Sequence, residues 1–99
     1  MLATEELFPG TGPAALVELA ELARRERDPA RAREYLDAAS KSVDIDDSTI
    51  VKSLIVRGRL LTDEGNTADA ESVWQSILTH PSASGRHRQI AANRGAAVP

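Results

Sequence analysis

Residues 54–81 carry the pattern of two helices joined by a tight turn, and this stretch constrains the fold more than any other part of the sequence. Gly58, a small residue, lies in the middle of the first helix, where a second helix can pack closely. The dipeptide Gly65-Asn66 then interrupts the periodicity, and Pro81 ends it. Between these breaks, apolar residues follow the i, i+3, i+4, i+7, i+8 spacing of one helix face: Ala70, Val73, Trp74, Ile77 and Leu78. The pattern predicts a helix-turn-helix pair with small residues where the helices cross.

A second copy of this pattern lies 38 residues earlier in the chain. Its members, in order, are Leu16, Ala20, Ala23, Ala32, Leu36 and Ala39, which match Leu54, Gly58, Leu61, Ala70, Trp74 and Ile77. The two copies resemble units of the tetratricopeptide repeat (TPR), whose usual period is about 34 residues. The resemblance covers residues 13–81. It implies an all-α fold of two helix-turn-helix units that presents surfaces to other proteins and does not catalyse a reaction. The alternative is a generic four-helix bundle, which would bury much the same residues.

Helix start and stop signals divide the chain into four helices and a short fifth. The expected bounds are Pro13–Glu26, Pro29–Ser42, Asp47 or Ser48 to Glu64, Thr67–Thr79 and Ser84–Arg94. Asp28 and Asn66 precede two of these helices as caps, and Gly65 ends the third. The predicted organisation is an N-terminal extension at 1–12, a TPR-like domain at 13–81 and a basic C-terminal helix or tail at 82–99. Residues 1–10 and 95–99 are expected to fray.

Composition limits the class of protein further. Ninety-nine residues make one small domain, and its core must be aliphatic because only Phe8, Tyr35 and Trp74 are aromatic. The chain has no cysteine, and neither a signal peptide nor an apolar run of membrane-spanning length is evident. We therefore expect a cytoplasmic protein. Ten arginines against two lysines, with abundant alanine, suggest a GC-rich bacterial genome.

No pattern of catalytic, metal-binding or cofactor-binding residues emerges. The two histidines, His80 and His87, are seven residues apart across Pro81 and Gly85, which is not the spacing of a helical metal pair. Neighbouring carboxylates such as Asp63-Glu64 do not face each other on a helix. We expect no enzyme activity, no metal and no cofactor.

Charge is unevenly distributed between the body and the C-terminal tail. Residues 1–81 carry nine basic and fifteen acidic groups, for a net charge of −6, whereas residues 82–99 carry three arginines and no acid. The tail could bind an acidic partner, RNA or its own body, or remain solvated. Nucleic acid is not favoured, since the net charge is negative and the tail has no aromatic residue for stacking. Its candidate contact residues are Arg86, Arg88, Ile90 and Arg94.

The resemblance also implies a peptide-binding groove, because in this family the first helix of each unit lines a concave surface. On this sequence the groove would present Arg24, Lys52, Ile55 and Arg59. Its basic character suits an acidic segment or a terminal carboxylate. The asparagines that the family uses to clamp a carboxylate are absent from these positions, and the alternative is that these are ordinary solvated charges.

These features together predict a non-catalytic adaptor that binds a peptide or protein partner. Two alternatives remain: an accessory subunit that docks on an enzyme, and a precursor whose helices are recognised by a modifying enzyme. Arrays usually need about three units, because a terminal unit leaves an apolar flank. That flank, on the helix at 67–79, is expected to be covered by the 84–94 helix, by a second copy of the chain or by another protein.

Overall fold

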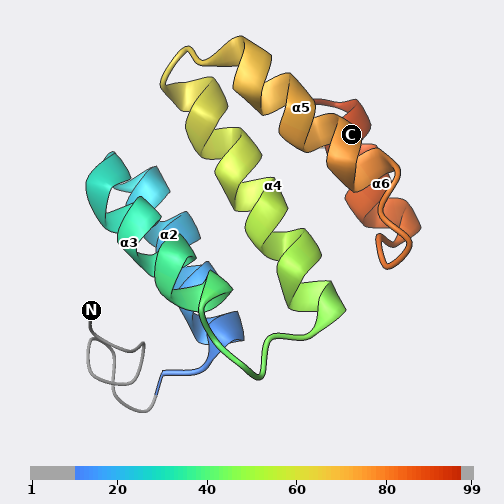
Figure 1. The fold of residues 1–99 in the computed structure, drawn as a ribbon. Helices are drawn as coiled ribbons and strands as arrows, with labels where there is room; N and C mark the ends of the chain where they lie inside the picture. The colour runs from blue at the N-terminus through green and yellow to red at the C-terminus, as the bar shows by residue number, and fades with distance from the viewer. Residues whose placement is uncertain (1–10, 97–99) are drawn as a thin grey trace. The chain divides into compact units, whose positions relative to one another are not determined.

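The computed structural model describes residues 11–96, and these form five α-helices (Figure 1). Their bounds are α2 (Pro13–Arg25), α3 (Pro29–Ser40), α4 (Asp47–Asp63), α5 (Thr67–Leu78) and α6 (Gly85–Ala92). The prediction of an all-α fold is confirmed for this part of the chain, and each helix ends within two residues of its expected position. The predicted extension at 1–12 falls, apart from its last two residues, outside the described range.

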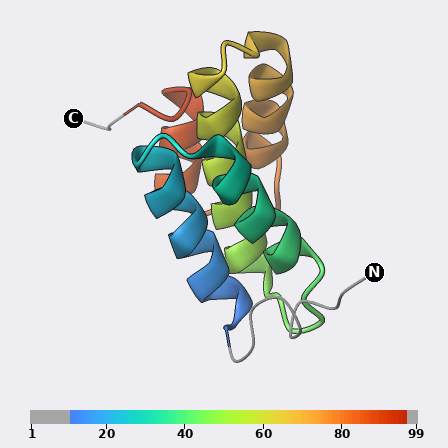
Figure 2. The same cartoon turned by 90° about the vertical axis from the view of Figure 1, so that its left-hand side faces the viewer.

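The chain divides into two compact units, Met1–Ile50 and Val51–Pro99. In the first unit, α2 and α3 form an antiparallel hairpin, which Figure 1 and Figure 2 show from two sides. Its two helices bury mostly small residues: Leu16, Val17, Ala20 and Ala23 on α2, with Ala32, Leu36, Ala38 and Ala39 on α3. Five alanines among these eight positions let the two helix backbones approach closely. The six residues that repeat the pattern of residues 54–77 are all among them.

The turn between α2 and α3 recurs, bond for bond, between α4 and α5. The Asp28 amide donates to the Ala23 carbonyl at 2.9 Å, and 38 residues later the Asn66 amide donates to the Leu61 carbonyl at 2.9 Å. Arg27 and Gly65 occupy the left-handed region, with φ of 61° and 77°. This arrangement is the Schellman ending of an α-helix. Two hairpins with the same turn therefore follow each other along the chain.

Capping at the helix starts agrees with prediction at one site and differs at two. The Asp28 carboxylate accepts a hydrogen bond from the Arg31 amide at 3.2 Å, as expected for the start of α3. Asn66 holds the cap position of α5, but its side chain makes no capping bond. The start of α4 is capped by Asp46, which accepts from the Thr49 amide at 2.7 Å, rather than by Asp47 or Ser48. The capping carboxylate lies one residue before the helix, where it can reach the third free amide.

The core of the second unit is built around Trp74, the largest fully buried side chain, which is 1% exposed. The core cluster takes residues from α4, α5, α6 and the segment before α6: Val51, Ile55, Ala70, Trp74, Ile77, Ala83 and Ala91. Val73 and Leu78, predicted on the buried face of α5, are half-buried at the edge of this cluster. The helix α6 packs against α5, so it covers the apolar flank that the sequence predicts on the helix at 67–79.

The chain after α6 is also packed, which corrects the expectation that residues from 95 onward fray. Gly95, with φ of 81°, lies against the Trp74 indole, and its carbonyl accepts a hydrogen bond from Arg59 Nε at 3.1 Å. Residues 97–99 lie outside the described range. The predicted weak helix at 84–94 and the residue that follows it are thus part of the second unit.

Candidate functional site

A groove opens on the first unit between the C-terminal half of α2 and the N-terminal half of α3. We call it the α2–α3 groove, and its volume is about 390 Å³. Leu22, which is 52% exposed, stands in this groove although its side chain is large and apolar. Seven residues line it: Leu19, Leu22, Ala23, Glu26, Asp28, Arg31 and Tyr35. A recess with apolar side chains in its lining can receive an apolar group of another molecule.

Helical spacing explains why these residues gather. Leu19, Leu22 and Glu26 recur at intervals of three and four residues, so they share one face of α2. Arg31 and Tyr35 are four residues apart and share one face of α3. Because the two helices form a hairpin, one stripe from each becomes a wall of the groove.

Arg31 contacts Tyr35 at the edge of this groove. The Arg31 Nε donates to the Tyr35 hydroxyl at 3.1 Å, and the guanidinium carbon lies 5.8 Å from the ring centroid. The hydrogen bond to Tyr35 raises the pKa of Arg31, and an arginine guanidinium is charged in proteins in any case. The groove consequently has apolar walls and a charged rim that consists of Glu26, Asp28 and Arg31. Such a rim can pair with either charge on a partner while the walls hold an apolar side chain.

The four residues predicted to line a family-like groove are not presented together to solvent. Ile55 is 5% exposed and belongs to the core of the second unit, which corrects its assignment as a partner contact. Arg59 is half-buried and donates to the Gly95 carbonyl. Arg24 donates from Nε to the Glu21 carboxylate at 2.6 Å within the first unit. Of the four, only Lys52 has an exposed side chain.

The predicted tail residues divide into two pairs. Arg86 and Arg88 are exposed on α6, and Arg88 Nη2 donates to the His80 carbonyl at 3.4 Å. Ile90 packs against the core cluster, and Arg94 forms an ion pair with Glu71 in which Nε and Oε2 are 2.8 Å apart. Ile90 and Arg94 therefore contact other parts of the same chain, which was one of the roles that the sequence allowed for the tail.

Sequence reasoning missed the α2–α3 groove, although a signal for it was present. The buried stripe of α2 accounts for Leu16, Ala20 and Ala23. Leu22 lies off that stripe, and a leucine off the buried face marks either a second contact or an exposed apolar surface. The sequence distinguishes Tyr35 only as one of three aromatic residues. Which apolar residues surround a recess depends on how two helices pair, and periodicity within one helix does not contain that information.

His87 forms a capping box with Ser84 at the N-terminus of α6, and one hydrogen bond of this cap depends on the protonation of His87. Its backbone amide donates to Ser84 Oγ at 3.1 Å, and its Nδ1 accepts from the Ser84 amide at 3.2 Å. Partial burial, with the charges of Lys52 and Arg86, lowers the pKa of His87 below its ordinary value of 6.5. Protonation of Nδ1 removes the acceptor that the Ser84 amide needs.

We expect the protein to lose stability as the pH falls through 6.5, because below that value the unfolded chain binds a proton that the folded chain disfavours. The contribution is fully present above pH 6.5. His87→Gln should abolish this component, since glutamine accepts the same hydrogen bond without titrating in this range. Denaturant unfolding at pH 5.0 to 7.5 measures the effect, and His80→Gln is the matched control. A His87→Gln variant with the pH dependence of the wild type would contradict the assignment.

Comparisons with known proteins return no match, whether with family models, with curated proteins or with solved structures. Within residues 11–96, no helix is long and apolar enough to cross a membrane. The same residues contain no group of three or more histidine, aspartate or glutamate side chains arranged to hold a metal ion.

Proposed function

We propose that this chain is a non-catalytic, TPR-like interaction module that binds a peptide or protein partner through the α2–α3 groove. The observation that carries the proposal is Leu22, a large apolar side chain left 52% exposed in a recess of about 390 Å³. Exposing a leucine in a recess forgoes the stabilisation that burial would give, about 1.5–3 kcal/mol for a full side chain. A partner that inserts an apolar group there recovers part of it.

The TPR-like class is supported by the repeated hairpin. The same turn, with the same hydrogen bonds and a left-handed residue at its centre, recurs 38 residues apart at Arg27 and Gly65. Small buried residues, Ala20 and Gly58, occupy equivalent positions on the first helix of each hairpin. The period exceeds the usual length of about 34 residues. The additional residues fit the connector before α4, where insertion has a low free-energy cost.

The rim chemistry indicates what such a partner presents. An apolar side chain would enter between Leu22 and Tyr35. Polar or charged flanking groups would meet Glu26, Asp28 and Arg31, which line the same groove. Exposed ion pairs at such a rim contribute little free energy and mainly set orientation. Most of the affinity should therefore come from the apolar anchor, and it should depend only weakly on salt.

Replacing Leu22 with aspartate should weaken partner binding at least about ten-fold, the equivalent of losing roughly 1.4 kcal/mol from the apolar contact. The fold should survive because Leu22 is already half-exposed. Affinity capture with the full chain, followed by titration of the captured protein, measures the change. Val43→Asp is the matched control, since Val43 is 95% exposed and lies outside the groove.

The identity and stoichiometry of the captured protein separate the roles that the sequence left open. A peptide-bearing client supports an adaptor. An enzyme recovered in equimolar amount supports an accessory subunit, and an enzyme that modifies the chain supports a precursor. A partner that binds Leu22→Asp as tightly as wild type would place the binding surface elsewhere and contradict the groove.

A further inference from the structure

The Trp74 indole lies between two glycines, Gly58 and Gly95, which are far apart in the sequence of the second unit. A Cβ atom at Gly58, on α4, would lie 2.6 Å from Trp74 Cη2, and one at Gly95, after α6, would lie 2.8 Å from the same atom. Gly95 also has a φ of 81°, a backbone conformation that residues other than glycine rarely adopt. One of the surfaces that keep Trp74 buried is therefore supplied by the last described turn of the chain.

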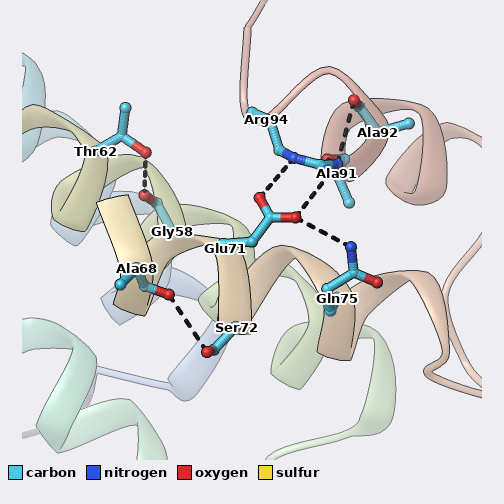
Figure 3. Close-up of polar contacts among 9 residues, drawn as sticks. All are labelled: Gly58, Thr62, Ala68, Glu71, Ser72, Gln75, Ala91, Ala92 and Arg94. Carbon is cyan, nitrogen blue, oxygen red and sulfur yellow. Dashed lines mark hydrogen bonds and ion pairs between the residues drawn. The ribbon is translucent and has the colours of Figure 1, made fainter. Parts of the chain in front are cut away.

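Polar contacts tie this turn to both neighbouring helices. Arg59 on α4 donates from Nε to the Gly95 carbonyl at 3.1 Å. Arg94 makes a two-pronged ion pair with Glu71 on α5, with Nε 2.8 Å from Oε2 and Nη2 2.8 Å from Oε1 (Figure 3). Gln75 Nε2 donates to the same Oε1 at 3.1 Å and holds the carboxylate in place. The segment is thus fastened over the tryptophan on two sides.

The ion pair that fastens this segment is partly exposed, and the segment buries only two small apolar side chains, Ala83 and Ala91. Arg94 and Glu71 are both partly exposed, and an ion pair in that setting contributes about 0–1 kcal/mol. The helix α6 has eight residues, of which Ala91 is the one fully buried, and a helix this short is not stable alone. The helix α5, by contrast, buries Ala70, Trp74 and Ile77. Segments with few buried apolar contacts open before the rest of a protein unfolds.

We propose that residues 83–95 form a latch that opens while α4 and α5 stay folded, and that the face it uncovers binds a helix from a partner protein. The latch itself shows the chemistry of that helix. It would carry a branched and a small apolar residue, as Ile90 and Ala91 do, followed by a cation that reaches Glu71. The latch and the partner helix compete for the Trp74 face, so the contact is autoinhibitory.

Residue-resolved hydrogen exchange on the full chain tests the opening step. Latch amides, such as those of Arg94 and Gly95, should exchange at least about ten-fold faster than core amides of α4 and α5. Gly95→Ala should widen this gap and make Trp74, the only tryptophan, more accessible to acrylamide. The same substitution at Gly85, where a Cβ meets nothing within 4 Å, is the matched control and should raise neither quantity. Latch and core amides that exchange at one common rate would overturn the proposal.

A synthetic peptide spanning residues 82–96 tests the binding step, with Trp74 fluorescence as the readout. It should bind Gly95→Ala several-fold more tightly than Gly85→Ala, because the weakened latch competes less. Val43→Asp, added to either glycine variant, should leave its affinity unchanged, because Val43 is 95% exposed and lies in the other unit. Equal binding to the two glycine variants, or none to either, would overturn the proposal. Dimers that exchange latches, detected by light scattering of the wild type, would assign the face to a second copy and overturn the assignment to a partner.

Discussion

Replacing Trp74 with alanine is expected to lower the free energy of unfolding by about 3–5 kcal/mol, the range for large aromatic truncations in a core. Trp74 is 1% exposed and is the largest fully buried side chain of the chain's described part. The cavity cannot close easily, because most of its walls come from α4 and α5, and closing it would require the backbones of these two helices to move. A small domain is stable by only about 5–15 kcal/mol, so the loss is a large share of the total.

Chemical denaturation followed by far-ultraviolet circular dichroism measures this loss without relying on tryptophan emission. Val43→Ala is the control, since Val43 is 95% exposed and substitutions at such sites usually change stability by less than about 0.5 kcal/mol. An unchanged midpoint for Trp74→Ala, combined with lost partner binding, would show that the residue is an exposed anchor in solution. Equal losses for both variants would show that the helices are not held by this core.

The sequence predicted the helices because each is bounded by residues with a local conformational preference. Pro13, Pro29 and Pro81 restrict where a helix begins or ends, and Gly65 supplies the left-handed residue that closes α4. Apolar spacing then identified which side of each helix is buried. Arg27 was not expected at the equivalent turn, since arginine adopts a positive φ reluctantly. The repeated hydrogen bonds of that turn show that the context imposes the conformation.

The contacts made by the C-terminal segment could not be predicted, because they join residues far apart in the chain. Arg59 and Gly95 are 36 positions apart, and Glu71 and Arg94 are 23 apart. Periodicity reports only on neighbours within one helix. Because α6 has few apolar residues, its sequence resembles that of a frayed tail. The segment is nevertheless packed, because Gly95 and Ala91 belong to the core around Trp74. Similarly, Arg59 was assigned to a binding groove because its bond to a distant carbonyl leaves no trace in the local pattern.

Gly58 tests the same core from the opposite side of the indole. Glycine within a helix costs about 1 kcal/mol relative to alanine, so at an open position Gly→Ala is stabilising. At Gly58 the new methyl group would lie 2.6–2.8 Å from three atoms of the Trp74 ring. While the latch is closed, the ring has little room to retreat, because Gly95 lies against two of the same atoms, Cη2 and Cζ2. We therefore expect the sign of the effect to reverse.

Gly58→Ala should destabilise the protein, because an overpacking cost of about 1–3 kcal/mol opposes the gain in helix propensity. Gly58→Leu adds more volume at the same point and should cost more. Gly85→Ala is the control, since a Cβ there meets nothing within 4 Å, and it should be neutral or slightly stabilising. Denaturant midpoints of the three variants and the wild type give the comparison. If Gly58→Ala were stabilising like an ordinary helical substitution, the close approach of α4 to Trp74 would be refuted, and with it the main support for equating Gly58 with the small crossing residue of a helical repeat.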